Sequence, residues 1–163
     1  MTQDTFRLIN CFFQIGASIS MNNDDKKERK KLELLLKPMD LFTKYYEPSP
    51  AVCFDEIMVP FQGRFKFLVY CPQKPDQWGI KFYSLCDSKN GYCMGLTPSF
   101  GKLDGTLEKI IDKHLQVWKD KHIQFFFCDN FYTTIQLAIN LKNKYNIETT
   151  GTMAEIENIY HQS

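Results

Sequence analysis

The sequence has no dominant charge, no long apolar run and no pair of cysteines at metal-binding spacing. Its 163 residues carry 20 Lys and Arg against 19 Asp and Glu, which gives a net charge of +1. The net charge therefore does not indicate nucleic-acid binding, although basic residues can still cluster locally. No apolar run approaches the ~18 residues that a membrane span needs, and the stretch 8–19 lacks the basic start of a signal peptide. We expect no membrane partner.

The cysteines argue against a zinc module and against a disulfide scaffold. Cysteine occurs at positions 11, 53, 71, 86, 93 and 128, without a Cys-x-x-Cys pair, and no Cys/His set has zinc-finger spacing. Disulfide frameworks belong to short, loop-rich secreted chains, whereas this sequence has long apolar segments. We therefore expect reduced thiols in the cytosol or nucleus. Phosphate loops and dinucleotide fingerprints are also lacking.

What the sequence does contain is enough apolar material for a packed core. It is 44% hydrophobic and 15% aromatic, which argues against disorder and against a coiled coil. Apolar residues follow helical spacing over 5–15 and over 34–46, where Pro38 interrupts the pattern and Pro48 and Pro50 mark a boundary. The polar run 21–31 between them is either a basic patch for phosphates or a solvated linker.

Beyond residue 50 the periodicity changes to that of a sheet with helices. The segments 51–54, 57–59, 65–70, 78–86 and 92–96 read as strands, with a type I′ turn at Asn90-Gly91. A helix at 107–118 with Asp104 as N-cap is followed by strand 123–128, which is typical of a strand covered on both faces. A helix capped by Thr133 and a strand at 147–150 complete the order. This alternation predicts an α/β mixed sheet with helices packed on it.

Two aspartates stand in the same local context. Asp87 and Asp129 each follow a cysteine at the C-terminal end of an apolar strand, and α/β folds place ligands at this edge of the sheet. If the two strands are parallel neighbours, the carboxylates lie side by side. Paired carboxylates repel unless a proton or cation lies between them, and their oxygens suit Mg²⁺ or Mn²⁺. The alternative is that Asp-Ser and Asp-Asn only form turns at strand ends.

Several segments, in order and at similar spacing, resemble the central part of piggyBac-type transposases and of the proteins derived from them. Residues 55–64 are similar to the family's Asp-Glu-x-x-x-x-Phe-x-Gly-Arg element, and 72–82 to its Pro-x-Lys-Pro and Gly-Ile-Lys elements. Residues 86–92 and 128–131 resemble the segments that bear its first two catalytic aspartates. The similarity covers nearly the whole chain, up to about residue 153.

The resemblance implies a ribonuclease H-like catalytic fold of the DDE class, in which three carboxylates hold two Mg²⁺ or Mn²⁺ ions. One metal would activate the attacking water or 3′-hydroxyl, and the other would stabilise the leaving oxygen of the phosphodiester. By position, Asp87 and Asp129 would be the first two acids, both catalytic and metal-binding. Asp55 and Glu56 belong to a matched element but are not expected to be ligands, and Glu56 is expected to serve the local fold.

The third acid of the family lies well beyond the second, in a Gly-Gly-x-Asp-like segment that these 163 residues do not contain. We therefore expect a truncated ribonuclease H-like domain that does not cleave DNA alone, because losing a carboxylate misplaces the metals. The expected division is a small helical region at 1–48, a partial ribonuclease H-like transposase domain at 49–152 and a divergent tail at 153–163.

A second candidate surface combines basic and aromatic side chains. The pattern indicates either a surface that faces DNA or strand residues whose lysines point to solvent. The basic residues are Arg64, Lys66, Lys74 and Lys81, interleaved with Phe65, Phe67, Tyr70 and Trp78.

Three functions stay open at this point: a transposase catalytic domain, a domesticated module that binds DNA or protein without catalysis, and a relic without a selected function. For the first, the resemblance implies DNA, in particular transposon ends, as the partner. It also implies the nucleus as the location, with the cytoplasm as the alternative, and it leaves a homodimer open.

Overall fold

The computed structural model describes residues 2, 3, 5, 29–32, 34, 36–61, 63–72, 74–101 and 106–152. The chain divides into two compact units, Met1–Asp40 and Leu41–Ser163. This division precedes the boundary expected at 48/49, because Phe42 and Tyr46 pack against the core of the second unit. Nearly all of the helix expected at 5–15, most of the polar run 21–31, the N-cap expected at Asp104 and the tail 153–163 lie outside the described residues.

The interrupted helix expected around Pro38 is a short 3₁₀ helix, η1 (Lys37–Leu41), followed by one turn of α-helix, α3 (Phe42–Tyr45). Proline in a helix interior removes a backbone hydrogen bond, which explains why no continuous α-helix runs through this segment. Within the described part of the chain, none of the helices is long and apolar enough to cross a membrane.

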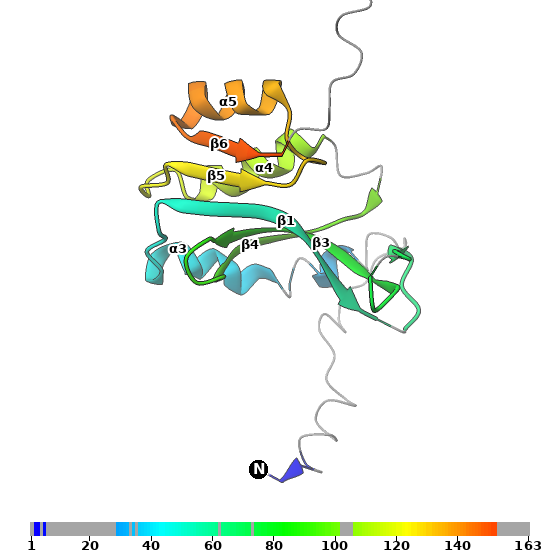
Figure 1. Cartoon of the computed structure of the whole chain (residues 1–163). Coiled ribbons are helices and arrows are strands. Elements are labelled where there is room, and N and C mark those ends of the chain that lie inside the picture. Colours follow the sequence, from blue (N-terminus) through cyan, green and yellow to red (C-terminus); the bar gives the residue numbers. More distant parts are fainter. Residues whose placement is uncertain are drawn as a thin grey trace, which may run out of the picture. The chain divides into compact units, whose positions relative to one another are not determined.

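The second unit is built on a six-stranded mixed sheet (Figure 1), which confirms the expected α/β class. The strand order is β2-β3-β1-β5-β6, and β4 pairs with β3. Two helices, α4 (Leu107–Val117) and α5 (Ile135–Tyr145), follow β4 and β5 in the chain. The strands are β1 (Ala51–Pro60), β2 (Leu68–Tyr70), β3 (Trp78–Asp87), β4 (Cys93–Pro98), β5 (Phe125–Cys128) and β6 (Glu148–Gly151).

Strand β1 lies between β3 and β5 and decides which side chains become neighbours. It is antiparallel to β3, with Val52 opposite Asp87, and parallel to β5, with Phe54 opposite Cys128. The two strands expected at 51–54 and 57–59 are therefore one strand of ten residues. Its ladder continues through Asp55 and Glu56 without a break.

The core lies between one face of this sheet and the helices. Aliphatic residues of α4 and α5 meet alternate residues of β1, β3 and β5, as a sheet with one packed face requires. Trp118, just after α4, is 1% exposed, and its indole N–H donates to the carbonyl of Met94 at 3.3 Å. The core residues include Val52, Phe54, Leu85, Ile111, Leu115, Phe126, Tyr132, Leu137 and Leu141.

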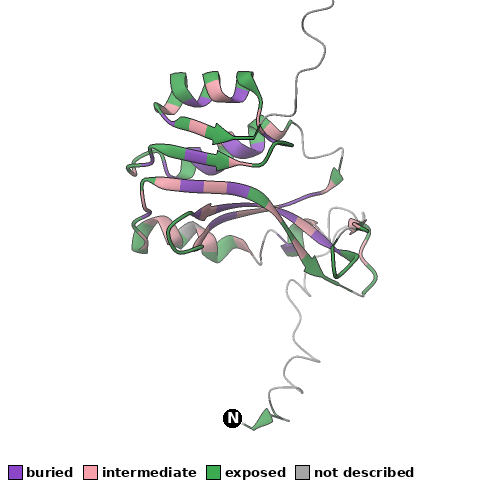
Figure 2. Cartoon of the chain, in the orientation of Figure 1, coloured by how far each residue is buried: buried purple, intermediate pink, exposed green. Residues whose placement is uncertain are grey.

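The opposite face of β1 and β5 is open within the described chain. Phe126 is fully buried, whereas its neighbours Phe125 and Phe127 are 42% and 38% exposed, an alternation that Figure 2 shows. The expectation that β5 is covered on both faces is therefore wrong. Its continuous apolar run reflects one core face and one face on which aromatic rings meet solvent.

Two local expectations about turns and caps are also corrected. Among the described non-glycine residues only Asn146 has a positive φ, so Asn90 lacks the conformation that a type I′ turn needs. Instead, the Gly91 N–H donates to the carbonyl of Asp87 at 2.8 Å, which closes a wider turn. Helix α5 is capped by Thr134 rather than Thr133, because the Thr134 hydroxyl accepts from the Leu137 N–H.

Candidate active site

Asp87, the first of the two predicted acids, is a buried and fully engaged carboxylate. It ends β3 and is 1% exposed. Its oxygens accept from the Ser49 N–H (2.7 Å) and hydroxyl (2.6 Å), the Lys89 N–H (2.8 Å) and the Tyr46 hydroxyl (2.8 Å). Burial alone raises the pKa of Asp87, but the bonds from Ser49, Lys89 and Tyr46 outweigh it and lower the pKa to about 2. This carboxylate ties the segment before β1 to the β3–β4 turn.

The structure does not bring Asp87 and Asp129 together. Their strands, β3 and β5, are separated by β1 and run in opposite directions. Two strand spacings put roughly 10 Å between them across the sheet, and a three-residue offset in register adds roughly 10 Å along it. Asp87 also lies opposite the buried Val52, hence on the core face. The parallel-neighbour arrangement expected for these two aspartates is wrong, because the sequence pattern does not reveal that β1 intervenes.

Extending the register of β1 and β5 by one residue puts Asp55 beside Asp129. Phe54 of β1 is opposite Cys128, the last residue of β5, each is followed by an aspartate, and the main chains of parallel neighbours are about 5 Å apart. Both aspartates are exposed. Because successive residues of a strand face opposite sides, Asp55 lies on the open face while Phe54 lies in the core.

Hydrogen bonds fix the backbone around both carboxylates. Each accepts from the N–H of the next residue: Asp55 from Glu56 at 2.7 Å and Asp129 from Asn130 at 2.6 Å. The carbonyl of Asp129 accepts from the N–H groups of Tyr132 (2.9 Å) and Thr133 (3.0 Å). These hydrogen bonds to the main chain of Asp129 close the turn after β5.

One further contact joins β1 to the turn after β5. The hydroxyl of Tyr132, whose ring is 1% exposed, donates to the carboxylate of Glu56. Glu56 follows Asp55 directly, and Tyr132 is three residues beyond Asp129, so this bond joins the two chain segments that carry the acids. A role of Glu56 in the local fold, as expected from the sequence, is consistent with this contact.

The sequence pattern separated 51–54 from 57–59, whereas Asp55 and Glu56 lie inside one continuous strand, β1. Val52, Cys53 and Phe54 are all apolar, so the sequence shows no apolar/polar alternation here. Only within a continuous strand does Asp55 lie on the face opposite Phe54. The identity of the neighbouring strand, however, cannot be read from such a pattern.

The predicted basic residues fall into two groups. Arg64, Lys66 and Lys74 are exposed on the connections between β1 and β3, beyond the point where Pro60 pairs with Gly79. Lys81 is half-buried on β3, and its ammonium lies 5.3 Å from the centroid of the Tyr83 ring. The first group therefore presents charge to solvent at one end of the sheet, whereas Lys81 packs on an aromatic face.

Exposed aromatic rings accompany this basic group. Tyr70 and Trp78 are opposite each other on β2 and β3, with ring centroids 5.0 Å apart, and are 49% and 55% exposed. Lys74 lies in the connection between them. Phe65 and Phe67, in contrast, contact each other, and Phe67 also contacts the ring of Phe100.

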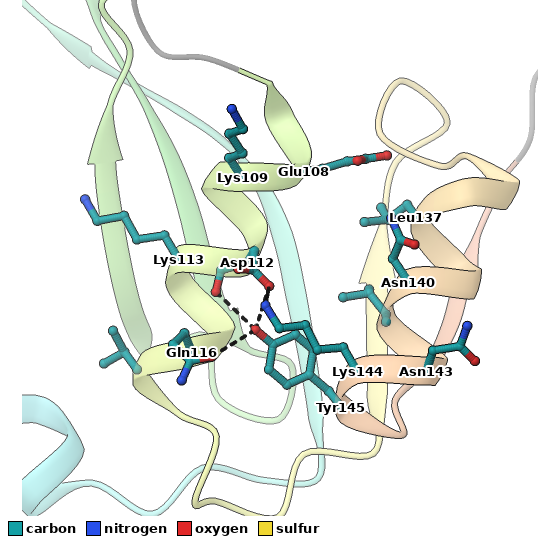
Figure 3. A pocket seen from close by; sticks show the side chains of 12 residues that line it. Glu108, Lys109, Asp112, Lys113, Gln116, Leu137, Asn140, Asn143, Lys144 and Tyr145 are labelled. Atoms are coloured by element: carbon teal, nitrogen blue, oxygen red, sulfur yellow. Dashed lines mark hydrogen bonds and ion pairs between the residues drawn. The ribbon is translucent and has the colours of Figure 1, made fainter.

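A separate groove of about 840 Å³ lies between α4 and α5 (Figure 3). The Asp112 carboxylate lies in its lining and accepts from Lys144 (2.5 Å) and from the Tyr145 hydroxyl (2.7 Å). These two contacts lower the pKa of Asp112. The acid is thus held by partners of its own, and the helices that form the groove pack on the core rather than on the face of Asp55.

The donor set of the open face is consistent with a hard cation. Asp55 and Asp129 offer carboxylate oxygens, which Mg²⁺ and Mn²⁺ prefer. In the part of the chain that the structure describes, no group of three or more His, Cys, Asp or Glu side chains could hold a metal ion. Asp55 and Asp129 therefore form no such group with a third side chain among the described residues.

Comparison with known proteins agrees with this fold. A family profile described as Transposase IS4 matches residues 1–159. Among solved structures, the chain is similar to a piggyBac transposase whose synaptic complex with hairpin DNA was determined by cryo-electron microscopy, with a TM-score of 0.73 and 28% sequence identity. That match covers 97% of this chain and 34% of the transposase chain, so this chain spans about a third of its length. The chain belongs to the Transposase IS4 family of DDE-type transposases.

Proposed function

We propose that this chain forms the central part of a piggyBac-type DNA transposase, in which Asp55 and Asp129 bind Mg²⁺ or Mn²⁺ at a DNA phosphodiester. The observation that carries the proposal is the parallel pairing of β1 with β5, in which Phe54 opposite Cys128 makes the two following aspartates neighbours. The similarity to the piggyBac transposase, at 28% identity over nearly the whole chain, supports the choice of subfamily.

The proposal assigns Asp87 a different role from the one that its Cys-Asp-Ser context predicts. A metal ligand needs free lone pairs directed at solvent or substrate, whereas the oxygens of Asp87 are taken by Ser49, Lys89 and Tyr46 in the interior. Asp55 and Asp129 are exposed on the open face. We therefore keep Asp129 as an acid of the centre and replace Asp87 by Asp55.

The residues around the pair position it. Two like charges on adjacent strands repel, so the ionised pair is most stable with a cation between the carboxylates. When bound, a divalent ion would polarise the phosphodiester and help generate the attacking nucleophile. The N–H groups of Glu56 and Asn130 hold one oxygen of each carboxylate, and the bond between Tyr132 and Glu56 limits movement of the turn after β5 relative to β1.

The proposal is tested by locating the metal in the unmodified chain. Fe²⁺ bound in place of Mg²⁺, with ascorbate and peroxide, cuts the backbone next to its ligands, and mass spectrometry maps the cuts. We expect cuts next to residues 55 and 129 that excess Mg²⁺ suppresses. Cuts next to residue 87, or cuts that Mg²⁺ does not suppress, would contradict the assignment of the centre to β1 and β5.

We further propose that DNA contacts the exposed end formed by Lys74, Tyr70 and Trp78. From Asp55 to Pro60, β1 covers roughly 17 Å along this direction, so a DNA strand on the open face can reach both places. Phosphate contacts come from lysine and arginine, and exposed aromatic rings provide stacking surfaces.

The DNA surface yields a prediction in salt dependence. In duplex DNA binding measured by fluorescence anisotropy, Lys74→Ala should reduce the slope of log affinity against log salt by about 0.9, the value for one phosphate contact. Lys119→Ala is the matched control, because Lys119 is exposed just beyond α4, at the other end of the chain's second unit. Equal slopes for the two variants would remove Lys74 from the interface.

A further inference from the structure

Three cysteines form a row across three adjacent strands. In the registers of β1 with β3 and of β3 with β4, Cys53 is opposite Cys86, and Cys86 is opposite Cys93. All three are free thiols of intermediate burial. The row uses none of the residues proposed for the metal centre, and the spacing of these cysteines in the sequence does not reveal it.

We propose that Cys86 and Cys93 form a peroxide-reactive dithiol that closes to a disulfide across the β3–β4 hairpin. Directly opposite residues of an antiparallel pair have Cα atoms about 4.5 or 5.5 Å apart. Both values lie within the roughly 4.4–6.8 Å that a disulfide spans. The register shift between Leu85 and Cys86 adds local freedom at the point where the bond would form, because a bulge interrupts the ladder.

The two thiols are not equivalent, and their difference assigns the nucleophile. The hydrogen bond from Cys86 lowers the pKa of Cys93 to about 7, although burial opposes this. The same hydrogen bond raises the pKa of Cys86, with a further contribution from burial. Cys93 is thus the thiol that ionises more readily at neutral pH, with Cys86 beside it as the second thiol.

The reaction has two balanced steps. The Cys93 thiolate attacks the terminal oxygen of a hydroperoxide; an S–O bond forms, the O–O bond breaks, and the sulfur becomes a sulfenic acid while the peroxide is reduced to an alkoxide or hydroxide. The sulfur of Cys86 then attacks that of Cys93; the S–S bond forms, the S–O bond breaks, and the departing hydroxide takes the Cys86 proton as water. The product links both ends of the turn 87–92.

The first test measures the reactivity of each thiol in the folded chain at pH 7. A thiol of pKa about 7 is about half ionised, against a few per cent for an ordinary cysteine. Limited alkylation followed by peptide mapping should therefore show Cys93 reacting roughly five to ten times faster in the folded chain than in the urea-unfolded chain. Equal rates would overturn the assignment of Cys93 as the nucleophile.

The second test treats the full chain with one equivalent of hydrogen peroxide and maps crosslinks by mass spectrometry. We expect a Cys86–Cys93 crosslink that dithiothreitol reverses, that is lost in Cys86→Ser and in Cys93→Ser, and that persists in Cys53→Ser, the matched control from the same row. Circular dichroism confirms that each variant is folded. A Cys53–Cys86 crosslink, or sulfinic acid at Cys93 without a crosslink, would overturn the proposal.

Discussion

Asparagine in place of Asp55 or of Asp129 is expected to weaken Mn²⁺ binding by about tenfold to a hundredfold, measured by the electron paramagnetic resonance of free Mn²⁺. Each substitution keeps the shape of the side chain but removes a charged oxygen donor, and hard divalent cations depend on that charge. The two aspartates follow neighbouring residues of β1 and β5, so one cation can contact both. The double variant should bind Mn²⁺ only slightly more weakly than either single variant, because each substitution removes the same site.

Asp120→Asn is the control for this measurement. Asp120 is exposed in the turn after α4, outside the open face, so this variant should bind Mn²⁺ as the unmodified chain does. If Asp120→Asn weakened binding as much as Asp55→Asn, the effect would come from overall charge rather than from a site. Unchanged binding in Asp129→Asn would contradict the proposed centre.

Alanine in place of Asp87 is expected to lower the free energy of unfolding by about 3 kcal/mol, measured by urea denaturation. The reason is the set of four bonds from Ser49, Lys89 and Tyr46 to a carboxylate that is 1% exposed. Removing the acceptor leaves the partly buried N–H and hydroxyl of Ser49 without their partner, and each such group carries its own desolvation cost.

The same carboxylate predicts the response to acid. Folding lowers the pKa of Asp87 from its ordinary 3.8 to about 2, so the folded state favours the ionised form. Its contribution of about 2 kcal/mol is complete above pH 4 and is lost as the pH falls from about 4 to about 2. Denaturation midpoints across this window should fall less steeply in Asp87→Asn than in the unmodified chain.

These two sets of variants distinguish a carboxylate that stabilises the fold from a carboxylate that binds the metal. Asp87→Asn should leave Mn²⁺ binding unchanged in conditions where the chain is folded, while Asp55→Asn should leave the free energy of unfolding within about 0.5 kcal/mol, as expected for an exposed residue. If Asp87→Asn abolished Mn²⁺ binding with little loss of stability, Asp87 would be a metal ligand and the role assigned from its hydrogen bonds would be wrong.

Much of the local structure could be predicted from residue patterns. The period of the apolar residues predicts α4 around Ile111 and Leu115, a mostly apolar stretch predicts β3, and an unbroken apolar run predicts β5. These elements depend on interactions between residues a few positions apart, which any short stretch of sequence reports. Two errors are local. The polar pair Asp55-Glu56 predicts a break between strands although β1 continues through it, and Asn90-Gly91 predicts a type I′ turn although Asn90 has no positive φ.

The sequence by itself determined the elements and the mixed sheet, and it predicted an acid, Asp129, at the end of an apolar strand. Only the tertiary structure decided which residue lies beside it. The Cys-Asp repeat favours Asp87, yet β1 separates β3 from β5 and presents Asp55 beside Asp129. The physical reason is that alternation along a strand specifies which face a side chain occupies, whereas strand order and register depend on contacts between distant segments, which no local pattern encodes.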